Sequence, residues 1–380
     1  MSISAVESQA IVIGAGPAGL AVGACLKQAN IQTIILEQND KAGSAWHSHY
    51  DRLHLHTDKK HSALPLLPYP KVYPRYPSRM EVLEYLESYA KTFQLDIRFH
   101  QKVVSACCRN DKWEVQTQDT LYQAANLVVA SGYNREPVRP NWPGQNLFKG
   151  TLLHSSQYKN GETFQGQKVL VVGFGNSGGE IAIDLWEHGA QASIAIRSAV
   201  NVIPRELFGI PFLFIAIPQK KLSPRLADII NAPILRLLVG DLSSYGLRKA
   251  PYGPMTQART HAHIPLVDVG TLKLIKEGHL TVQPGIQEFT PGGVKFTDGQ
   301  ECNFDAVILA TGFHPRVDSF LEENSTSLDQ EGTPLQSGRM AAIPGLYFCG
   351  YYIAPTGMLR EIGMEAKQIS ASIAARKTSK

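Results

Sequence analysis

The stretch KVLVVGFGNSGGEIAIDLW, residues 168–186, joins an apolar run to a helix-like one through a glycine-rich turn. Residues 168–172 predict a buried strand, and the apolar spacing from Glu180 to Trp186 predicts a helix. Between them, GFGNSG fits the pattern GxGxxG, in which the glycines allow a tight turn, close approach of a pyrophosphate, and helix–strand packing. The helix N-terminus adds N–H groups and a positive dipole end. We therefore expect a dinucleotide to contact Gly173, Gly175, Asn176, Ser177 and Gly178.

The N-terminus carries the same pattern a second time. Residues 10–13 form an apolar, strand-like run, and GAGPAG follows at 14–19 before an alanine-rich helix predicted to end at about Gln28. Two copies in one chain imply two bound nucleotides. The contacts expected from this copy are Gly14, Gly16, Pro17, Ala18 and Gly19.

The residue at the end of each second strand distinguishes the two nucleotides. The run 31–36 ends in Glu37, whose carboxylate can accept both ribose hydroxyls and would repel a 2′-phosphate. The run 192–196 ends in Arg197 and Ser198, and an arginine there suits a 2′-phosphate. The offsets from the first glycine are nearly equal, 23 positions for Glu37 and 24 for Arg197. We therefore predict FAD in the first unit and NADPH in the second.

This arrangement predicts an α/β fold of two dinucleotide-binding, Rossmann-like domains, one of them discontinuous. We expect an FAD domain of residues 1–150 and 296–380 and an NADPH domain of residues 151–295. An apolar insertion at about 207–242, interrupted by four prolines, departs from the nucleotide-domain pattern. It is interpretable as core packing, a homodimer contact, an apolar substrate entrance or a patch on a membrane surface.

Composition excludes several classes. The net charge of +4 over 380 residues is too small and too scattered to indicate a nucleic-acid partner. The chain shows no signal-peptide pattern and no apolar run of membrane-spanning length, which predicts a cytoplasmic protein without a membrane span. The five cysteines form no CxxC, which weighs against a flavoprotein disulfide reductase. Five histidines between residues 47 and 61 lack the ligands to complete a metal shell, so no metal site is expected.

Further motifs connect the two glycine turns. Gly43 and Trp46 form G-x-x-W, and two strand-like runs end in the small-residue turns 130–132 and 310–312, the second containing Thr311 and Gly312. The linker before the second turn reads F-x-G-x-x-x-H-x-x-x-Y-K from Phe148 to Lys159. With these motifs the chain resembles the class B flavin-dependent monooxygenases over nearly its whole length. Tyr158 favours the flavin-containing monooxygenase branch, since Baeyer-Villiger enzymes have Trp at that position.

Within that branch several stretches resemble the plant YUCCA enzymes and their bacterial relatives, which oxidatively decarboxylate indole-3-pyruvate to indole-3-acetate. They are VVGFGNSGGEIAIDL at 171–185, IPLVDVGTL at 264–272 and VQPGI at 282–286, together with Tyr245 to Leu247 and Gly253-Pro254. Animal members place an Asn near the reactive flavin face, where this chain has Thr57, Asp58 and Lys59. That departure disfavours amine or sulfide oxygenation.

The resemblance implies how the cofactors and oxygen are used. NADPH would reduce the flavin, reduced flavin would take up molecular oxygen as a C4a-(hydro)peroxide, and this species would oxygenate a small organic substrate. Lys59 and His154 are the candidate catalytic residues, and Arg205 is a further candidate for holding NADPH. The resemblance also implies flavin contacts from the C-terminal part, namely Gly350, Thr356 and Gly357, the last two preceding a helix from Met358. The motif residues Gly43, Trp46, Thr311 and Gly312 are likewise expected to contact a cofactor.

Four alternatives stay open at this point. Three keep the scaffold: oxygenation of a soft nitrogen or sulfur, Baeyer-Villiger oxidation of a ketone, and an uncoupled NADPH oxidase. The fourth is a serine hydrolase, because residues 175–179 also match GxSxG with Ser177 as the nucleophile. A hydrolase would have no need of the upstream GxGPAG and Glu37.

Overall fold

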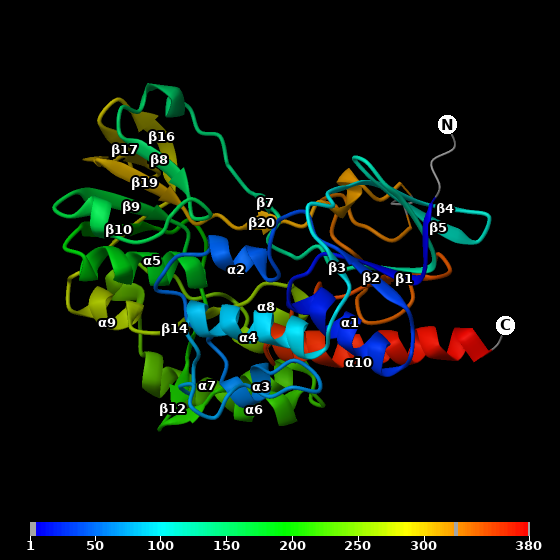
Figure 1. Cartoon of the computed structure of the whole chain (residues 1–380). Helices are drawn as coiled ribbons and strands as arrows, with labels where there is room; N and C mark the ends of the chain where they lie inside the picture. Colours follow the sequence, from blue (N-terminus) through cyan, green and yellow to red (C-terminus); the bar gives the residue numbers. More distant parts are fainter. Residues whose placement is uncertain (1–4, 323–325, 379–380) are drawn as a thin grey trace.

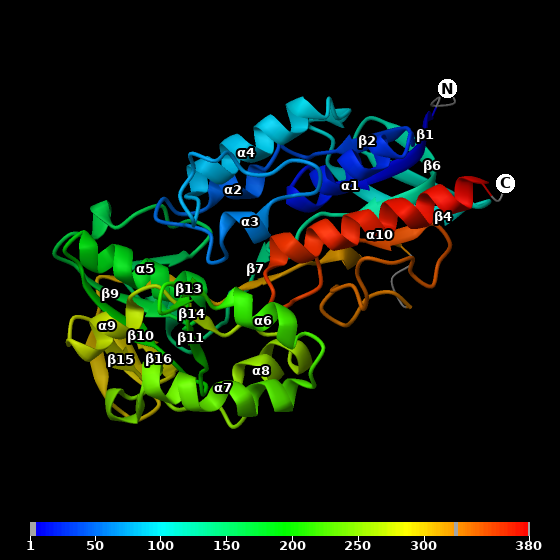
Figure 2. The same cartoon turned by 90° about the horizontal axis from the view of Figure 1, so that it is seen from below.

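The computed structural model describes residues 5–322 and 326–378 and contains two α/β units joined side by side (Figure 1). Each unit has a mainly parallel sheet with helices against it, and the chain passes between the units more than once. Seen from below, α1, α4 and α10 belong to one unit and α5 and α9 to the other (Figure 2). The predicted α/β class is confirmed.

The first sheet has seven strands among the described residues, in the order β3-β2-β1-β6-β5-β4, with β21 also paired to β6. β1 runs parallel to β2 and β6, whereas β4, β5 and β6 form an antiparallel meander. β1 is central because its second half, residues 10–13, is apolar and buried, as a strand covered on both faces requires. The strands are β1 Val6–Ile13, β2 Thr33–Leu36, β3 Ile97–Arg98, β4 Val103–Arg109, β5 Lys112–Thr117, β6 Leu121–Val129 and β21 Leu346–Phe348.

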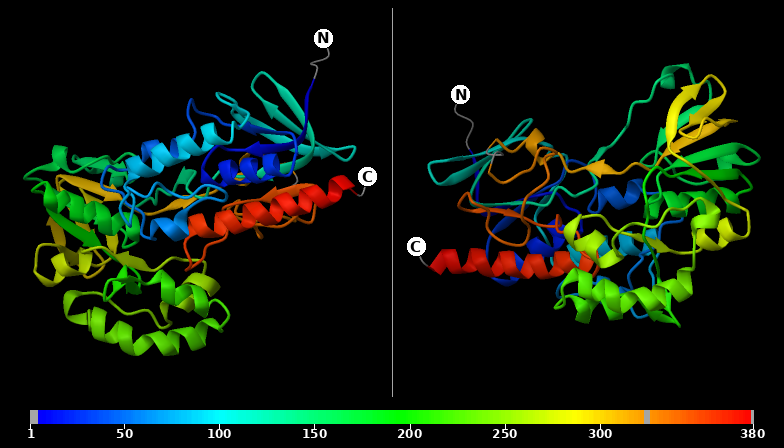
Figure 3. Two further views of the ribbon diagram at one scale, coloured as in Figure 1. Left: turned by 60° about the horizontal axis from the view of Figure 1, so that its bottom comes forward. Right: turned by 180° about the vertical axis from the view of Figure 1, so that it is seen from behind.

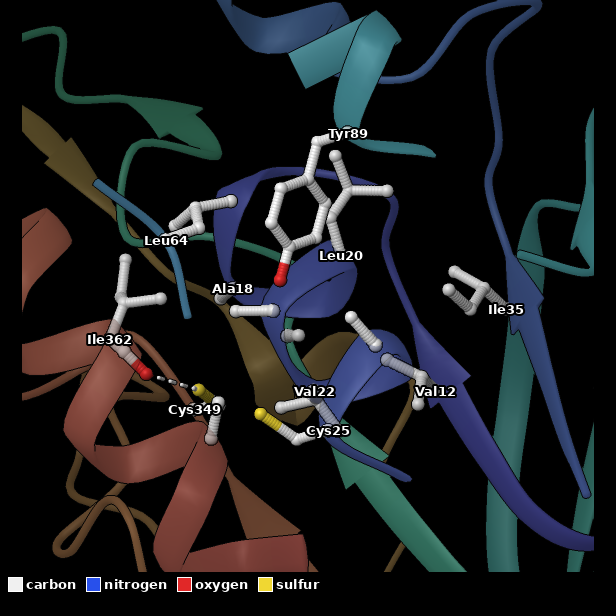
Figure 4. Close-up of a cluster of buried hydrophobic side chains, with 14 of the residues drawn as sticks. Val12, Ala18, Leu20, Val22, Cys25, Ile35, Leu64, Tyr89, Cys349 and Ile362 are labelled. Carbon is white, nitrogen blue, oxygen red and sulfur yellow. Dashed lines mark hydrogen bonds between the residues drawn. The ribbon is translucent and has the colours of Figure 1, made fainter. Parts of the chain in front are cut away.

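Three long helices pack in this unit, α1 Pro17–Gln28, α4 Arg79–Thr92 and α10 Met358–Thr378. α4 begins at a capping box, in which the Ser78 hydroxyl accepts the N–H of Glu81 and the Glu81 carboxylate accepts the N–H of Ser78. Figure 4 shows α1 enclosed by its neighbours: Leu20 and Val22 lie between Ile35 of β2, Tyr89 of α4 and Ile362 of α10. Two short helices, α2 Ser44–Ser48 and α3 Lys59–Ser62, lie on the loop that leads to α4.

The second sheet is parallel throughout, in the order β15-β10-β9-β19-β8 among the described residues. Its strands are β8 Thr151–His154, β9 Lys168–Val172, β10 Gln191–Ala195, β15 Thr281–Gln283 and β19 Ala306–Leu309. α5 Asn176–Glu187 and α9 Thr271–Lys276 cover one side, and an antiparallel sheet of β16 Ile286–Thr290, β17 Gly293–Phe296 and β18 Glu301–Asn303 packs nearby.

The pairing of β19 bears on the domain division. β19 lies between β9 and β8, so residues 306–309 belong to the second sheet and not to the first. The chain then returns to the first unit through β20 Phe313–His314, which pairs antiparallel with β7 Glu136–Pro137 on the outward crossing (Figure 3). We therefore propose that the second domain ends near residue 312, in place of the expected boundary at 296.

The apolar insertion forms a helical lobe on the second unit. It contains a hairpin of β12 Glu206–Leu207 and β13 Ile210–Pro211, followed by α6 Leu213–Gln219 and α7 Pro224–Val239, and α8 Pro254–Thr260 packs against α7. β11 Val202–Pro204 and β14 Leu266–Asp268 pair in parallel where the lobe joins the unit. In Figure 2, α7 lies along the outer edge of the molecule, on the far side of the lobe from α10.

Candidate functional site

The two glycine turns have the same geometry. Gly14 and Gly173 both have positive φ, +102° and +111°, which L side chains rarely adopt. A Cβ at Gly14 would lie 2.6 Å from the carbonyl oxygen of Ala130, and one at Gly173 would lie 2.5 Å from that of Ala310. Each turn therefore packs against the backbone at the end of the neighbouring strand, which leaves no room for a side chain at the first glycine.

The second glycine of each turn faces open space. Gly16 is the N-cap of α1 and Gly175 the N-cap of α5, and a Cβ at either would meet no atom within 4 Å. The third glycines, Gly19 and Gly178, have no such room, since a Cβ would collide with the carbonyl oxygens of Gly14 and Gly173. Each turn thus leaves a cradle at a helix N-terminus, where N–H groups and the dipole favour an anion. Both cradles fit a dinucleotide pyrophosphate.

Glu37 is held at the edge of the first cradle. Only 4% of its surface is exposed, and its carboxylate accepts hydrogen bonds from the N–H of Ala15 (2.9 Å), from both nitrogens of Asn39 (3.0 Å each) and from the hydroxyl of Ser44 (3.1 Å). Gly43 donates its N–H to the carbonyl of Ala15 at 2.8 Å. The carboxylate is therefore hydrogen-bonded to the glycine turn itself, at the residue between Gly14 and Gly16.

The other residues expected near FAD lie on α2 or close to the N-termini of α1 and α10. Trp46 of α2 packs on the first core, with its ring edge-on to His49. Gly350 approaches α1, since a Cβ there would lie 3.1 Å from that of Ala18. Gly357 precedes α10, and a Cβ there would lie 3.1 Å from the Thr57 side chain. The structure thus brings the N-termini of α1 and α10 to the same region of the first unit, as the expected flavin contacts require.

The N-terminus of α10 carries buried polar groups. Thr356 is fully buried and donates its hydroxyl to Glu361 at 2.5 Å. Glu361, 3% exposed, also pairs with Arg360 and with Lys220 of the loop after α6, each at 2.8 Å. Because Lys220 lies in the lobe, this ion pair ties the lobe to the first unit beside the α10 N-terminus.

The residues expected near NADPH are more open. Arg197 and Ser198 are exposed at the end of β10, beyond the second cradle. The Asn176 side chain accepts the N–H of Val267 at 2.8 Å through its Oδ1, so it anchors α5 to β14. Arg205 lies farther along, its guanidinium 4.2 Å from the centre of the Tyr76 ring, in a pocket of about 400 Å³ shared with His54, Arg75 and Glu206.

Neither candidate catalytic side chain is available for chemistry in this geometry. Lys59 donates its three N–H bonds to the carbonyls of Pro70 (3.3 Å), Lys71 (2.8 Å) and Tyr73 (2.5 Å), so it closes the loop between α3 and α4. His154 is fully buried, with Nδ1 accepting the N–H of Ser156 at 3.1 Å and Nε2 donating to the Gly312 carbonyl at 3.1 Å. Burial lowers the pKa of this imidazole. We therefore assign both residues structural tasks.

His154 and its neighbours pin the crossing between the units. The Gly312 carbonyl also accepts the N–H of Val138 at 3.0 Å, and the Thr311 hydroxyl donates to the Val138 carbonyl at 2.5 Å. Thr311 and Gly312, expected near a cofactor, thus hold the two crossing segments together. A Cβ at Gly312 would meet nothing within 4 Å, so its outer side stays open.

Sequence reasoning missed most of the contacts along the seam between the units. Tyr158, buried in the linker, donates to Asp184 of α5 at 2.5 Å, and burial raises the pKa of the phenol. His56 pairs at 2.5 Å with Glu180, which is 4% exposed and lies one turn beyond the second cradle. Lys159 donates to the carbonyls of His47, Ser48 and His49 at the end of α2. Tyr158 and Lys159 had a signal, in the Tyr-Lys ending of the linker motif, whereas His56 and Glu180 had none.

Among the residues that the structure describes, no group of three or more His, Cys, Asp or Glu side chains is arranged to hold a metal ion. Within the same residues no helix combines the length and apolar character needed to cross a bilayer.

Comparison with known proteins places this geometry in context. Residues 11–204 match the family model described as pyridine nucleotide-disulphide oxidoreductase. The chain is 40% identical over 347 residues to a probable indole-3-pyruvate monooxygenase, YUCCA4 of Arabidopsis thaliana, and the aligned part covers 90% of this chain and 84% of that protein.

Two solved structures share the fold. A flavin-containing monooxygenase from Stenotrophomonas maltophilia superposes with a TM-score of 0.75 at 23% identity, covering 98% of this chain and 99% of that one. A cyclohexanone monooxygenase from Rhodococcus sp. Phi1 bound to NADP+ superposes with a TM-score of 0.77 at 19% identity, covering 99% and 85%. The predicted resemblance is confirmed.

Proposed function

The chain belongs to the class B flavin-dependent monooxygenases, and from this premise we propose that it oxidatively decarboxylates a 2-oxo acid such as indole-3-pyruvate. The observation that carries the proposal is that relatives near 40% identity, aligned over more than four fifths of their length, are named as indole-3-pyruvate monooxygenases. The motifs of residues 171–185 and 264–272 lie in the second unit, around the N-terminus of α5 and β14.

The proposed reaction balances with the cofactors of the family. The enzyme uses FAD and NADPH. One 2-oxo acid, O₂, NADPH and a proton give the acid one carbon shorter, CO₂, water and NADP+. The bond between the carboxylate and the keto carbon breaks, one oxygen atom enters the new acid and the other leaves as water. When bound, FAD supplies the oxygen activation and NADPH supplies the hydride.

The geometry of the first unit supports our proposal that FAD binds there. The Gly16 cradle and the N-terminus of α1 would hold the pyrophosphate, and Glu37 lies where it can accept ribose hydroxyls. The second unit repeats the cradle at Gly175, with Arg197 at the strand end for the 2′-phosphate. In this proposal the chain's own groups bind and orient, and no side chain of the Thr57–Lys59 loop acts as an acid or base.

The contacts of the lobe support exclusion of water beside the α10 N-terminus. The ring of Phe214 in α6 meets His61 of α3 edge-on at 4.9 Å between centroids, and the Lys220–Glu361 ion pair lies on the same side of the lobe. Asp58 is buried and accepts N–H groups at the start of α3. This loop is therefore held in place by hydrogen bonds, as a pocket that protects a water-sensitive oxidant requires.

Turnover with a defined 2-oxo acid tests the proposal. Purified enzyme is supplied with FAD, NADPH, oxygen and indole-3-pyruvate, and indole-3-acetate formed is compared with NADPH consumed. Catalase is present because free hydrogen peroxide decarboxylates 2-oxo acids without an enzyme. We expect nearly one product per NADPH, and no product when NADPH is omitted.

Other outcomes would identify the alternatives. NADPH consumption with hydrogen peroxide as the sole product would contradict the proposal and indicate an oxidase. Efficient coupling to a thioether, a tertiary amine or a cyclic ketone, with none to indole-3-pyruvate, would assign the enzyme to the corresponding oxygenation instead. A colourless protein in which a phosphonate probe labels Ser177 would contradict flavin-dependent catalysis and indicate a serine hydrolase.

A further inference from the structure

The helix α7 turns an apolar stripe toward solvent. Leu226, Ile229, Ile230 and Leu237 are 46%, 68%, 53% and 76% exposed. With Pro233, which is also exposed, they recur at spacings of three and four and so share one face of the helix. A surface helix of a globular protein normally turns such a stripe inward, so this face has the pattern of a contact surface.

The opposite face of α7 is fixed by polar contacts and cannot rotate to bury the stripe. Asn231 and Gln219 of α6 form a reciprocal pair of amide hydrogen bonds at 2.8 and 2.9 Å, and both residues are buried. Asp228 accepts the N–H groups of Met255 and Thr256 at the start of α8, at 2.8 and 3.0 Å. Turning the helix would break these bonds and leave their groups unsatisfied, so the apolar stripe is committed to the outside.

The segment that contains the stripe carries a net positive charge. Residues 207–250 contain six basic residues and two acidic ones, a net charge of +4, which equals the net charge of the whole chain. The rest of the protein is therefore neutral as a whole. The basic residues are Lys220, Lys221, Arg225, Arg236, Arg248 and Lys249.

Two of these charges flank the stripe directly. Arg225 and Arg236 are exposed and lie along one side of it, whereas Asp228 is engaged on the inner face. Two copies of this chain meeting stripe to stripe would bring these like charges together, which disfavours a symmetric dimer. An anionic surface complements the same charges.

We propose that α7 docks the protein on the surface of an anionic lipid bilayer. The 16-residue helix, about 24 Å long, lies in the plane of the interface with its apolar stripe at the boundary between headgroups and acyl chains. Arg225 and Arg236 contact lipid phosphates. Binding is peripheral and reversible, and it weakens as salt screens the basic residues.

Vesicle sedimentation of the full-length flavoprotein tests the proposal. The vesicles are phosphatidylcholine alone or phosphatidylcholine mixed with phosphatidylglycerol, each at low and high salt. We expect the protein to sediment with the anionic vesicles at low salt and to be released at high salt. Ile229→Asp with Leu237→Asp should weaken this binding at least about tenfold. Arg225→Gln with Arg236→Gln should weaken it by about 25-fold, since each basic residue near an anionic surface contributes about fivefold.

The matched control is Val72→Asp, which places the same charge on a side chain that is 89% exposed in the loop before α4. It should bind vesicles like the unaltered protein, and the flavin content of every variant reports that it is folded. Equal binding to both vesicle types, or binding that the α7 variants leave unchanged, would overturn the proposal. So would a dimer in sedimentation velocity that Ile229→Asp with Leu237→Asp converts to a monomer, because the stripe would then be a contact between copies.

Discussion

The two glycine turns share one backbone design and differ at the strand end beside them. In the first unit Glu37 is 4% exposed and already accepts hydrogen bonds from Ala15, Asn39 and Ser44. In the second, Arg197 is exposed, and within the described part of the chain its guanidinium makes no hydrogen bond or ion pair. The first glycine turn therefore lies next to a carboxylate already held in place by hydrogen bonds, Glu37. The second lies next to an exposed guanidinium, that of Arg197.

This difference separates two tasks that a nucleotide site performs. The glycines create room and donors for a pyrophosphate and cannot distinguish one dinucleotide from another. The strand-end residue contacts the ribose, and the charge of its side chain determines whether a 2′-phosphate is attracted or repelled. A rigid, satisfied Glu37 suits a cofactor that stays bound, whereas an exposed Arg197 suits one that enters and leaves at each turnover.

The largest expected effect comes from filling the two cradles. Gly16→Val and Gly175→Val add a side chain where a Cβ meets no protein atom, so the fold should persist while the ligand is blocked. We expect Gly16→Val to be isolated without flavin. Gly175→Val should stay yellow and lose at least about 100-fold in its rate of reduction by NADPH. Flavin absorbance and anaerobic reduction measure the two effects, and a colourless Gly175→Val or a yellow Gly16→Val would reverse the assignment of the units.

Replacing the strand-end cation should have an intermediate effect. Arg197→Gln removes a charge-assisted contact to the 2′-phosphate, so kcat/KM for NADPH relative to NADH should fall about 10- to 100-fold. Arg205→Gln is the matched control, because that guanidinium rests on Tyr76 at 4.2 Å and we expect its loss to change the ratio less than about threefold. If instead kcat/KM for NADPH relative to NADH falls strongly in Arg205→Gln and is unchanged in Arg197→Gln, the 2′-phosphate lies in the pocket beside Tyr76.

The smallest expected effect concerns the seam that holds the two units in register. Burial, together with the charges of Lys159 and Arg79, lowers the pKa of His49 from 6.5 to about 4. The unfolded chain then binds a proton more readily than the native one between these values, so stability is complete above pH 6.5 and declines as pH falls toward 4. The loss should reach about 2 kcal/mol in the free energy of unfolding at about pH 5.

His49→Gln should remove this part of the acid sensitivity. Thermal unfolding at about pH 7.5 and about pH 5 measures it, and the variant's Tm should fall less between the two than that of the unaltered protein. An identical fall in both proteins would show that the histidine does not couple the seam to pH.

The sequence supplied most of the two nucleotide units because their requirements are local. Gly14 and Gly173 have positive φ, which favours glycine, and a buried parallel strand requires an unbroken apolar run. The glycine turns and the strands before them can therefore be recognised from a few neighbouring residues. Glu37 and Arg197 follow from a fixed offset along the same unit. The strands and helices around both turns could therefore be predicted to within a few residues.

The features that local sequence patterns do not determine depend on partners far along the chain. The run 306–309 looks the same in either sheet, and only the pairing with β9 and β8 places it in the second. Lys59 is satisfied by carbonyls of residues 70–73, which no residue pattern shows. Glu180 resembles a solvated helix residue in the sequence, yet it is buried against His56, 124 positions away. Side-chain availability, and with it catalysis, could not be predicted from spacing.

Anaerobic reduction of the purified protein, with NADPH and NADH compared at equal concentrations, tests the central claim most directly. No substrate or oxygen is present, so the bleaching of the flavin reports hydride delivery across the two units alone. The account predicts a yellow protein that one equivalent of NADPH bleaches at least about tenfold faster than NADH. A protein without flavin, or one that NADH reduces as fast as NADPH, would contradict the assignment of FAD to the Glu37 unit and NADPH to the Arg197 unit.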